Sequence, residues 1–490
     1  MFKKILVANR GEIAVRLIRA CRDLGIATVA VYEPNDINTM HVRLADECIQ
    51  IAEGGYNDPH QLLQGAIRSG ADAIHAGYAF LAENAPFVRA CEDAGLTFIG
   101  PSSVVLAALG DKIKTLDRVR AAGFPTIEYS SLSFDDGEDD GLRTEAERLG
   151  FPLIVKSSSG GRGRGTRLIR SAAQLDEMVH NARASARPIY GHRRVHLERA
   201  LLPSRYIEVQ LLGDRHGNLI HLGERDSSIQ RNNQKLIEES PAPYLTSAQR
   251  EKIWDMAIAI GRLLHCTHAC AVEFLMDGGG NIYFTEVKPR IQMEHPVSEL
   301  VSHIDIIREQ IRIAAGETLA YTQADVQLRG VAMQCRINAE DPSNGFLPSP
   351  GTLDRLQIPG GPHVRVDTYA YLGCEVSARY DVILAKLAVW GTNRDECIQR
   401  LRRALEDFIV GGIKTNLSLV QRAVAAPVFL SGNYNTEFSR TTLKRAKATN
   451  DELRNLAAAA AVAYLLRNQA HVTTLPDRLL SGWHRDSRSL

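Results

Sequence analysis

The most constraining stretch of this sequence is residues 271–286, where two apolar runs flank a turn. The first run ends at Glu273, residues 278–281 are typical of a turn, and the second run ends at Glu286. The pattern predicts a hairpin with both glutamates on neighbouring strands, where they repel each other unless a cation lies between them. We therefore expect Mg²⁺ or Mn²⁺, which prefer oxygen ligands and commonly bridge to nucleotide phosphates. A surface hairpin with solvated charges is the alternative.

A dense run of polar residues follows this hairpin. Arg290, Gln292, Glu294 and His295 come directly after Pro289. A single acidic side chain is most often solvated on the surface. So many polar residues at once, directly after an apolar strand, favour a functional site.

The composition limits the class of protein. The chain has 490 residues, too many for one core, which predicts about three domains. Its net charge of +1 gives no general electrostatic case for binding nucleic acid or an anionic membrane. It has no run of about 18 apolar residues, and charge interrupts the N-terminal MFKKILVANRGE too early for a signal peptide. The eight cysteines are scattered, which favours reduced thiols in a cytoplasmic protein.

Residues 5–31 have the pattern of a strand, a helix and a strand. The turn at residues 9–12, Asn-Arg-Gly-Glu, lacks the G-x-G-x-x-G of dinucleotide-binding folds, so a nicotinamide cofactor is not expected. A helix over 86–94 and a strand at 97–99 complete a first α/β domain, residues 1–110.

Three further segments are interpreted as structural elements and not as parts of a functional site. A single helix is predicted from about 103 to 122. The acidic run at 135–140 is interpreted as a solvated, mobile loop. The cluster His-Cys-Thr-His-Ala-Cys at 265–270 contains metal-ligand types, but its spacing fits no zinc pattern, so we interpret it as a helix end and a turn.

Lys156 ends a predicted strand and leads into a loop rich in glycine and serine, residues 157–166. Small residues let backbone N–H groups approach an anion, and the lysine supplies a point charge suited to phosphate. The loop is not a Walker A motif, because no G-K-[ST] follows. The segment indicates a phosphate site, with an ordinary glycine-rich turn as the alternative.

Together with several other motifs, these segments resemble the biotin carboxylase family of the ATP-grasp superfamily, over roughly residues 1–445. The matching motifs are KILVANRGEIAVRLIRACRDLGI, GYAFLAEN, FIGPS with GDK, the lysine–glycine loop, ERDSSIQRNNQK, EFL with TEVKPRIQMEHPVSE, QCRINAEDP with FLPSPG, and GIKTN.

The resemblance implies a mixed α/β and α+β fold that is usually paired as a homodimer. Its parts would be a Rossmann-like α/β domain (1–110), an ATP-grasp domain (111–329) with a mobile lid at about 130–204, and a C-terminal domain (330–445), followed by a helical tail (446–490). No Met-Lys-Met or Val-Lys-Met segment is present to accept biotin. Biotin is therefore expected on a separate biotin carboxyl carrier protein, and a carboxyltransferase subunit is a further expected partner.

The family chemistry that the resemblance implies has two steps: ATP phosphorylates bicarbonate to carboxyphosphate, and the CO₂ released from it carboxylates N1′ of biotin. The residues matching the catalytic set are Glu294 as general base, Arg336 as the residue that steadies the biotin enolate, Arg290 and Lys235. Those matching the bicarbonate pocket are Lys235, Arg290, Gln292 and the Met293 backbone. Those matching ATP contacts are Lys112, Lys156, Gly160, Gly161, Gly163, Arg164, Gly165, Glu198, Leu201, Gln230, Asn233, Glu273 and Glu286. The matching metal ligands are Glu273 and Glu286, with Lys288 at the position of the family's Asn ligand.

The chain departs from the family pattern around nucleotide and metal. An ammonium at Lys288 offers no metal ligand and repels Mg²⁺; it either supplies charge that a second metal would bring or damages the metal site. The other departures are Ser159 and Arg162 for lid glycines, Thr166 for a methionine, Tyr206 and Asn233 for histidines, and Ala76 and Ala79 for a proline and a glycine.

The tail is expected to form one helix. Thr449-Asn450 is a suitable cap, and an apolar stripe follows at Leu453, Leu456, Ala460, Tyr464 and Leu465. The helix either packs on its own body or docks a partner protein.

The sequence is consistent with two functions from different classes. The first is the biotin carboxylase subunit of a multi-subunit acetyl-CoA (acyl-CoA) carboxylase. The second is a catalytically impaired paralogue that acts as a structural or regulatory subunit, motivated by Lys288 and the altered glycine loop. An ATP-grasp ligase for a different acid is disfavoured by Arg290, Glu294 and Arg336 in their matching places.

Overall fold

The computed structural model describes residues 1–158, 166–190, 193–231, 233–443 and 450–468. The chain divides into two compact units, residues 1–443 and 444–490, which are described separately. Within the described part of the chain, no helix has the length and apolar character needed to cross a membrane.

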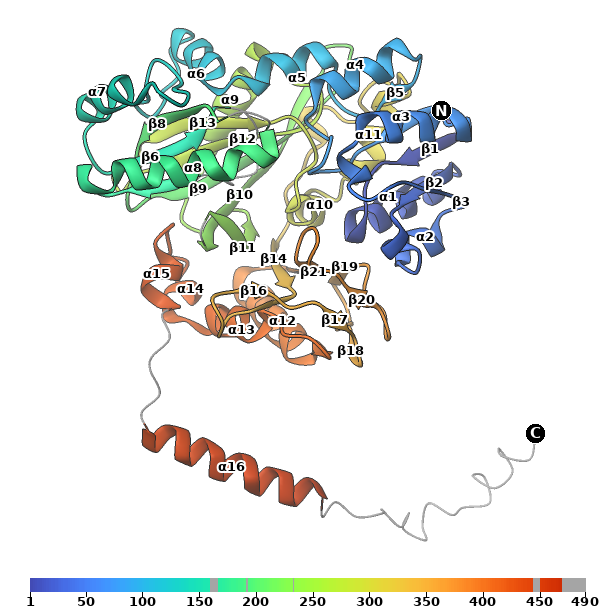
Figure 1. The fold of residues 1–490 in the computed structure, drawn as a ribbon, viewed down its shortest axis with the longest axis vertical. Helices are drawn as coiled ribbons and strands as arrows, with labels where there is room; N and C mark the ends of the chain where they lie inside the picture. Colours follow the sequence, from blue (N-terminus) through green and yellow to red (C-terminus); the bar gives the residue numbers. More distant parts are fainter. Residues whose placement is uncertain (159–165, 191–192, 232, 444–449, 469–490) are drawn as a thin grey trace. The chain divides into compact units, whose positions relative to one another are not determined.

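A parallel five-stranded sheet, in the order β3-β2-β1-β4-β5, forms the N-terminal part of the first unit (Figure 1). Its elements are β1 (Lys4–Val7), α1 (Gly11–Asp23), β2 (Ala27–Tyr32), η1 (Pro34–Asp36), α2 (Met40–Leu44), β3 (Glu47–Gln50), η2 (Gly55–Asn57), α3 (Pro59–Ser69), β4 (Ala73–His75), α4 (Ala85–Asp93) and β5 (Thr97–Phe98). The predicted strand–helix–strand pattern at 5–31 is confirmed, because β1 and β2 pair in parallel around α1. Helix α1 buries the periodic residues Ile13, Leu17 and Ile18.

The single helix predicted at 103–122 is wrong, because the segment forms two helices. Helix α5 (Ser103–Gly110) and helix α6 (Lys112–Ala121) are separated by Asp111, whose backbone is extended. The Asp111 carboxylate accepts a hydrogen bond from the Lys114 backbone N–H at 3.1 Å, so it caps α6. The break places Lys112 at the start of the second helix.

A three-stranded sheet, β7-β6-β8, occupies the predicted lid region (Figure 1). Its elements are α7 (Asp139–Leu149), β6 (Leu153–Ser157), β7 (Arg167–Ile169), η3 (Ala172–Gln174), α8 (Leu175–Tyr190) and β8 (Val195–Arg199). Helix α8 packs against all three strands. That this region moves as a lid stays a prediction.

The interpretation of residues 135–140 as a solvated loop is wrong in part. Helix α7 begins within the run, and Asp139 accepts a hydrogen bond from buried Arg183 of α8 at 2.7 Å. Arg183 also donates to the Asp135 carbonyl at 2.6 Å. The run therefore joins α7 to α8, a long-range pairing that local composition does not reveal.

An antiparallel eight-stranded sheet, β13-β12-β9-β10-β11-β14-β21-β19, forms the centre of the unit. The elements from its first strand onward are β9 (Arg205–Gly213), β10 (Leu219–Arg231), β11 (Gln234–Ser240), α9 (Ser247–Leu263), β12 (His268–Met276), β13 (Ile282–Lys288), α10 (His295–Ser302), α11 (Ile306–Ala314), η4 (Gln323–Asp325) and β14 (Val331–Asn338). Ile237 of β11 pairs with Cys335 of β14, so the sheet crosses the predicted domain boundary near 329. The exact domain boundaries stay a prediction.

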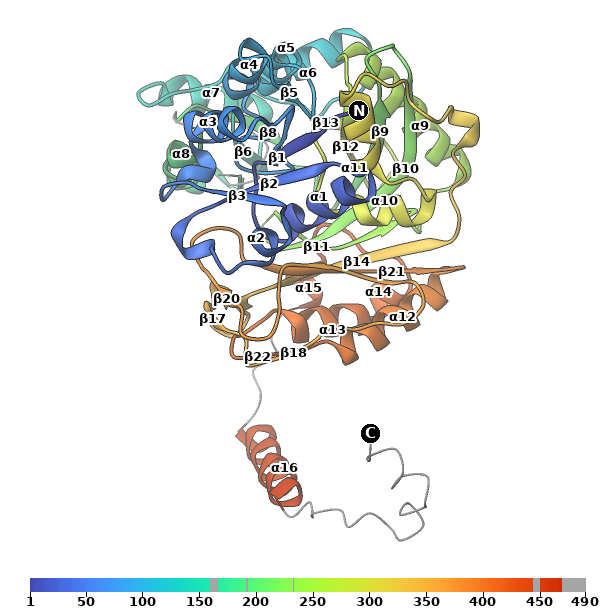
Figure 2. The same cartoon turned by 90° about the vertical axis from the view of Figure 1, so that its right-hand side faces the viewer.

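Helices α12 and α13 cover one face of the C-terminal strands (Figure 2). The elements here are β15 (Glu340–Asp341), β16 (Leu347–Pro348), β17 (Gly351–Thr352), β18 (Arg355–Gln357), β19 (Val364–Thr368), β20 (Glu375–Val376), β21 (Ile383–Gly391), α12 (Arg394–Asp407), β22 (Ile409–Gly411), α13 (Leu417–Ala425), α14 (Pro427–Leu430) and α15 (Phe438–Thr442). Leu401 and Leu405 of α12 share a buried core with Leu387 of β21 and Met333 of β14. This packing fixes β14, which carries a residue of the site described below.

The described residues of the second unit form helix α16 (Asn450–Asn468), where the sequence predicts a helix. Its Leu456 and Tyr464 side chains are exposed. The two hypotheses for its role stay predictions.

Candidate active site

Strands β12 and β13 form the hairpin predicted at 271–286. The Asp277 carboxylate closes its turn by accepting hydrogen bonds from the Gly279 and Asn281 backbone N–H groups, each at 2.9 Å. The register pairs Glu273 directly with Glu286. The predicted juxtaposition of these two carboxylates is therefore confirmed.

The two glutamates belong to a longer charged row across four neighbouring strands. Arg225 of β10 lies opposite Glu208 of β9, which lies opposite Glu273 of β12, which lies opposite Glu286 of β13. Directly opposed side chains share one face of a sheet, and like charges in such pairs are unfavourable. The two carboxylate–carboxylate pairs therefore require cations beside them.

Cations outnumber carboxylates at the Glu286 end of this row. The Nζ atoms of Lys112 and Lys288 each lie 2.9 Å from the same oxygen, Oε2 of Glu286. Nearby, Lys156 Nζ lies 2.6 Å from Glu198 Oε2. We call Glu286, Glu198, Lys112, Lys156 and Lys288 the Glu286 cluster.

The electrostatics of the Glu286 cluster keep both carboxylates ionised. Burial opposes ionisation of Glu286, but the surrounding ammonium groups outweigh it and hold its pKa well below the ordinary value. Burial also opposes ionisation of Glu198, but Lys156 and a hydrogen bond from His196 lower its pKa to about 2. With three ammonium groups against two ionised carboxylates, the cluster suits a polyanion such as a nucleotide phosphate chain.

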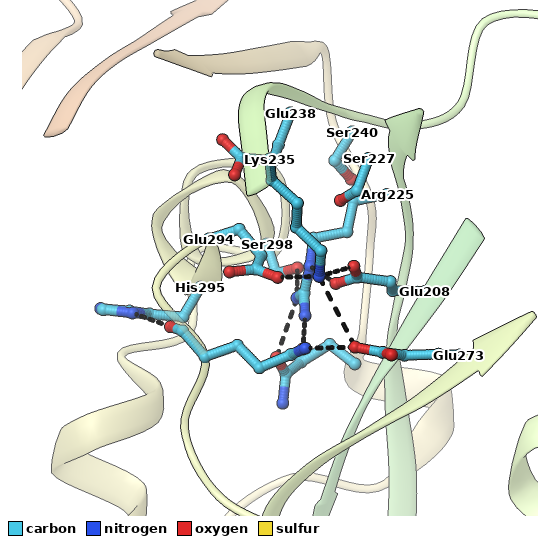
Figure 3. Close-up of polar contacts among 12 residues, drawn as sticks. Glu208, Arg225, Ser227, Lys235, Glu238, Ser240, Glu273, Glu294, His295 and Ser298 are labelled. Atoms are coloured by element: carbon cyan, nitrogen blue, oxygen red, sulfur yellow. Dashed lines mark hydrogen bonds and ion pairs between the residues drawn. The ribbon is translucent and has the colours of Figure 1, made fainter. Parts of the chain in front are cut away.

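Lys235 of β11 lies among three carboxylates at the other end of the row (Figure 3). Its Nζ contacts Glu208 and lies 2.5 Å from Oε1 of Glu294 and 3.5 Å from Oε1 of Glu273. Glu294 follows the β12–β13 hairpin and immediately precedes α10. One lysine thus joins the charged row to the polar run that follows it.

Two arginines complete this end of the site. Arg336 of β14 lies 3.1 Å from Oε2 of Glu294, and its Nε donates to Glu238 of β11 at 2.7 Å. Arg225 is fully buried and donates to Glu208 at 3.1 Å. We call the whole set the Lys235 cluster: Lys235, Arg225, Arg336, Glu208, Glu238, Glu273 and Glu294.

The carboxylates of the Lys235 cluster differ in their pKa values. Burial opposes ionisation of Glu294, but Lys235 and Arg336 outweigh it and hold its pKa well below the ordinary value. Burial raises the pKa of Glu208 to about 8 despite the attraction of Lys235, and burial also raises the pKa of Glu238. Glu294 is therefore an ionised carboxylate able to accept a proton, as a general base must.

Arg290 is held by the loop after β4 and lies near Glu294 and Glu273 of the Lys235 cluster. Its Nε donates to Oε1 of Glu83, in the loop after β4, at 2.6 Å. Gln292 donates to Glu273 at 2.8 Å. Met293 is half-buried next to Glu294. The structure thus brings the predicted bicarbonate residues to one place.

Three of the remaining predicted nucleotide residues lie in the described part of the chain, and the others lie outside it. Leu201 is half-buried two residues after β8. Gln230 donates to the Ser227 carbonyl at 2.8 Å, and Asn233 donates to the Thr166 carbonyl at 3.5 Å. The predicted loop residues outside the described part of the chain are Gly160, Gly161, Gly163, Arg164 and Gly165, together with the departures Ser159 and Arg162.

The donor set fits a divalent cation held by two carboxylates. Glu273 and Glu286 offer hard oxygen ligands directly opposite each other. Within the described ranges, no group of three or more His, Cys, Asp and Glu side chains is arranged to hold a metal. A cation here would therefore take further ligands from phosphate or water. Lys288 contacts Glu286 and has no lone pair to offer as a ligand.

Sequence reasoning did not select four charged members of this site, namely Glu83, Glu208, Arg225 and Glu238. One signal was available: Glu238 directly follows the apolar pair Leu236-Ile237 in a short strand. A charged residue in such a run is buried only when it is paired.

Three family models match successive parts of the chain. They are described as "Biotin carboxylase, N-terminal domain" (residues 1–106), "Carbamoyl-phosphate synthase L chain, ATP binding domain" (111–322) and "Biotin carboxylase C-terminal domain" (334–441). A biotin carboxylase of Nostoc sp. is 44% identical over 441 residues, covering 89% of this chain and 98% of the relative. The chain belongs to the biotin carboxylase family.

Relatives within this family carry different names. A pyruvate carboxylase subunit of Methanothermobacter thermautotrophicus is 41% identical over 442 residues, covering 89% of each chain. The biotin carboxylase domain dimer of Hydrogenobacter thermophilus 2-oxoglutarate carboxylase, solved with MgADP, ADP and bicarbonate, superposes with a TM-score of 0.87 at 42% identity, covering 91% of this chain and 100% of that one. The predicted fold class is thereby confirmed.

Proposed function

We propose that this chain is an active, ATP-dependent biotin carboxylase that carboxylates carrier-bound biotin with bicarbonate by way of carboxyphosphate. The observation that carries the proposal is the charged row with a cluster at each end: the Glu286 cluster has more cations than carboxylates, and the Lys235 cluster holds the ionised carboxylate of Glu294 between Lys235 and Arg336. A reaction between a polyphosphate and bicarbonate needs cations around the phosphates and, beside them, a base that can take the proton from bicarbonate.

The Glu286 cluster would hold ATP. Lys112, Lys156 and Lys288 supply point charges for the phosphate chain. Glu273 and Glu286 would hold Mg²⁺ or Mn²⁺, which neutralises phosphate charge when bound. The MgADP in the related 2-oxoglutarate carboxylase structure supports this assignment.

The Lys235 cluster would hold bicarbonate and activate it. Lys235 and Arg290 would bind the planar anion, for which a guanidinium is suited, together with Gln292 and the Met293 backbone. Glu294 would take the proton from bicarbonate as its oxygen attacks the γ-phosphorus, the bond from that phosphorus to ADP breaks, and carboxyphosphate forms.

Arg336 would act in the second step, carboxylation of biotin. It lies 3.1 Å from Glu294, so biotin would enter beside the base. A guanidinium there would stabilise the negative oxygen that develops on the ureido group as N1′ loses its proton. Cleavage of the bond between the carboxyl carbon and the bridging oxygen of carboxyphosphate would release CO₂ and phosphate. The phosphate would take the N1′ proton, and N1′ would attack the CO₂ to form carboxybiotin.

The proposed assembly is a homodimer that acts on a biotin carboxyl carrier protein and works with a carboxyltransferase subunit, in the cytoplasm. The biotin carboxylase domain of the related 2-oxoglutarate carboxylase is a dimer, which supports the proposed homodimer. We propose acetyl-CoA or another acyl-CoA as the final acceptor; relatives are named for pyruvate and 2-oxoglutarate carboxylases, which use other acceptors. The proposed acceptor is tested by purifying the native complex and identifying its carboxyltransferase subunit.

The test of the activity is ADP release with Mg·ATP and bicarbonate, with and without free biotin. Biotin-stimulated release that also requires bicarbonate would support a working carboxylase. The proposal would be contradicted if folded protein released no ADP above background, even after the carrier protein and the carboxyltransferase are added.

That negative result would favour the second candidate, a catalytically impaired structural or regulatory subunit. The observation behind this candidate is Lys288, whose ammonium contacts an oxygen of Glu286 that a metal would otherwise use.

A further inference from the structure

Two of the three lysines in the Glu286 cluster, Lys112 and Lys288, contact the Glu286 carboxylate, and the third, Lys156, contacts Glu198. Lys112 comes from the start of α6, Lys156 from β6 and Lys288 from the end of β13. Lys288 lies two residues after Glu286 on the same strand, so both side chains lie on the same face of the sheet. All three ammonium groups help to hold the pKa of Glu286 well below its ordinary value, against the effect of burial.

Lys288 is buried in this cluster. Its side chain is 7% exposed, and its Nζ lies 2.9 Å from Glu286 Oε2. It also attracts Glu83, the partner of Arg290: burial opposes ionisation of Glu83, yet Arg290 and Lys288 hold its pKa below the ordinary value. Lys288 therefore lies where the nucleotide side of the site meets the bicarbonate side.

The contact of Lys288 also limits how Glu286 can bind a metal ion. Oε2 of Glu286 already receives two ammonium groups, from Lys112 and Lys288. A divalent cation cannot use the same lone pairs unless an ammonium leaves, and an ammonium repels a nearby cation. While Lys288 stays, Glu286 has only its other oxygen for a metal.

We propose that Lys288 is a phosphate-binding residue that bridges Glu286 to the terminal phosphates of the nucleotide in place of one divalent cation, so that this chain works with a single metal ion. The inference rests on the proposed function and specifies its nucleotide site. The ammonium of Lys288 would neutralise negative charge on the phosphates, while Glu273 and the other oxygen of Glu286 would hold one Mg²⁺ or Mn²⁺.

The test counts Mn²⁺ by electron paramagnetic resonance on the full chain saturated with a non-hydrolysable ATP analogue. Wild type should hold one Mn²⁺ per chain. Lys288→Asn replaces the ammonium with a neutral oxygen donor and should hold two. At limiting Mn²⁺, this variant should bind the analogue at least about tenfold more weakly, because a charge-assisted hydrogen bond is lost, and excess Mn²⁺ should restore binding.

Two control variants make the comparison specific. Lys288→Arg keeps the positive charge and should still hold one Mn²⁺. Lys114→Asn removes an exposed lysine on the first turn of α6, with 82% of its side chain exposed, and should match wild type in both measurements.

Two Mn²⁺ ions on wild type would overturn the inference and leave the proposed function intact, whatever the variants do. One Mn²⁺ on folded Lys288→Asn with unchanged affinity for the analogue would overturn it as well. Wild type that binds no analogue would overturn the proposed function and this inference together.

Discussion

The Glu286 cluster and the Lys235 cluster both surround buried carboxylates with cations, but they differ in the ratio of cations to carboxylates and in the pKa values of those carboxylates. Each surrounds carboxylates of one charged row, and Glu273 and Glu286 are directly opposed where the two meet. The Glu286 cluster has three ammonium groups for two carboxylates. The Lys235 cluster has one lysine and two arginines for four carboxylates.

The difference shows how one sheet can prepare two unlike reactants. The excess cations of the Glu286 cluster would bind a polyphosphate with little rearrangement, since their partners already hold them in place. In the Lys235 cluster, Lys235 and Arg336 keep Glu294 ionised and able to accept a proton, while burial raises the pKa of Glu208 to about 8. The boundary between the clusters is therefore where phosphate and bicarbonate would meet.

The largest expected effect comes from removing Glu294, the proposed base in the Lys235 cluster. Glu294→Gln keeps the size of the side chain but cannot accept a proton, so bicarbonate-dependent ADP release should fall by about 10²–10⁴-fold. Nucleotide binding should change little, because Glu294 is not part of the Glu286 cluster. Steady-state assays with and without bicarbonate measure the first effect, and titration with MgADP measures the second. Retained bicarbonate-dependent turnover would refute the role of Glu294.

A smaller effect is expected at the link between the clusters. Glu83→Gln replaces the charged partner of Arg290, which should weaken the hold on its guanidinium and raise KM for bicarbonate by about tenfold. KM for ATP should stay within about twofold, which separates positioning of Arg290 from general damage. Glu147→Gln, at an exposed position on α7, is the matched control. Equal increases in both KM values would show that Glu83 has no specific role at Arg290.

The smallest effect concerns stability and pH. The folded protein keeps a proton on Glu208 up to about pH 8, whereas the unfolded chain loses it near the ordinary value of 4.5. The protonated Glu208 side chain therefore contributes its full share to the free energy of unfolding below pH 4.5. This contribution falls by up to about 1.4 kcal/mol per pH unit as the pH rises, and it is lost once the pH has passed 8.

Glu208→Gln removes this titration, so the fall of Tm with rising pH should become shallower, on the order of 1–2 °C per pH unit. Thermal denaturation across the same pH values measures it, with Glu251→Gln at an exposed position on α9 as control. Parallel pH profiles for Glu208→Gln and wild type would contradict the raised pKa.

Local patterns predicted the elements that set up the site, and their limits are visible in particular residues. The glycine-rich turn and two apolar runs predicted the hairpin that opposes Glu273 to Glu286. The same reasoning missed the break at Asp111, because a capping aspartate within an apolar periodic stretch differs little from an ordinary helical residue.

Partners that are distant in sequence could not be read from local patterns. Glu83 and Arg290 are 207 residues apart, and Lys235 and Glu294 are 59 apart. Only the strand order of the central sheet and the packing of the loop after β4 bring them together. The resemblance to a family named the residues of the site but not the balance of charge between its two ends.

The most direct test of the account compares MgADP affinity in Lys156→Gln and Lys235→Gln. Each variant removes one ammonium group, from the Glu286 cluster in the first case and from the Lys235 cluster in the second. The account predicts that Lys156→Gln weakens MgADP binding by at least about tenfold, while Lys235→Gln leaves it within about twofold and loses bicarbonate-dependent turnover. Equal loss of MgADP affinity in both variants would contradict the division of the site into a nucleotide half and a bicarbonate half.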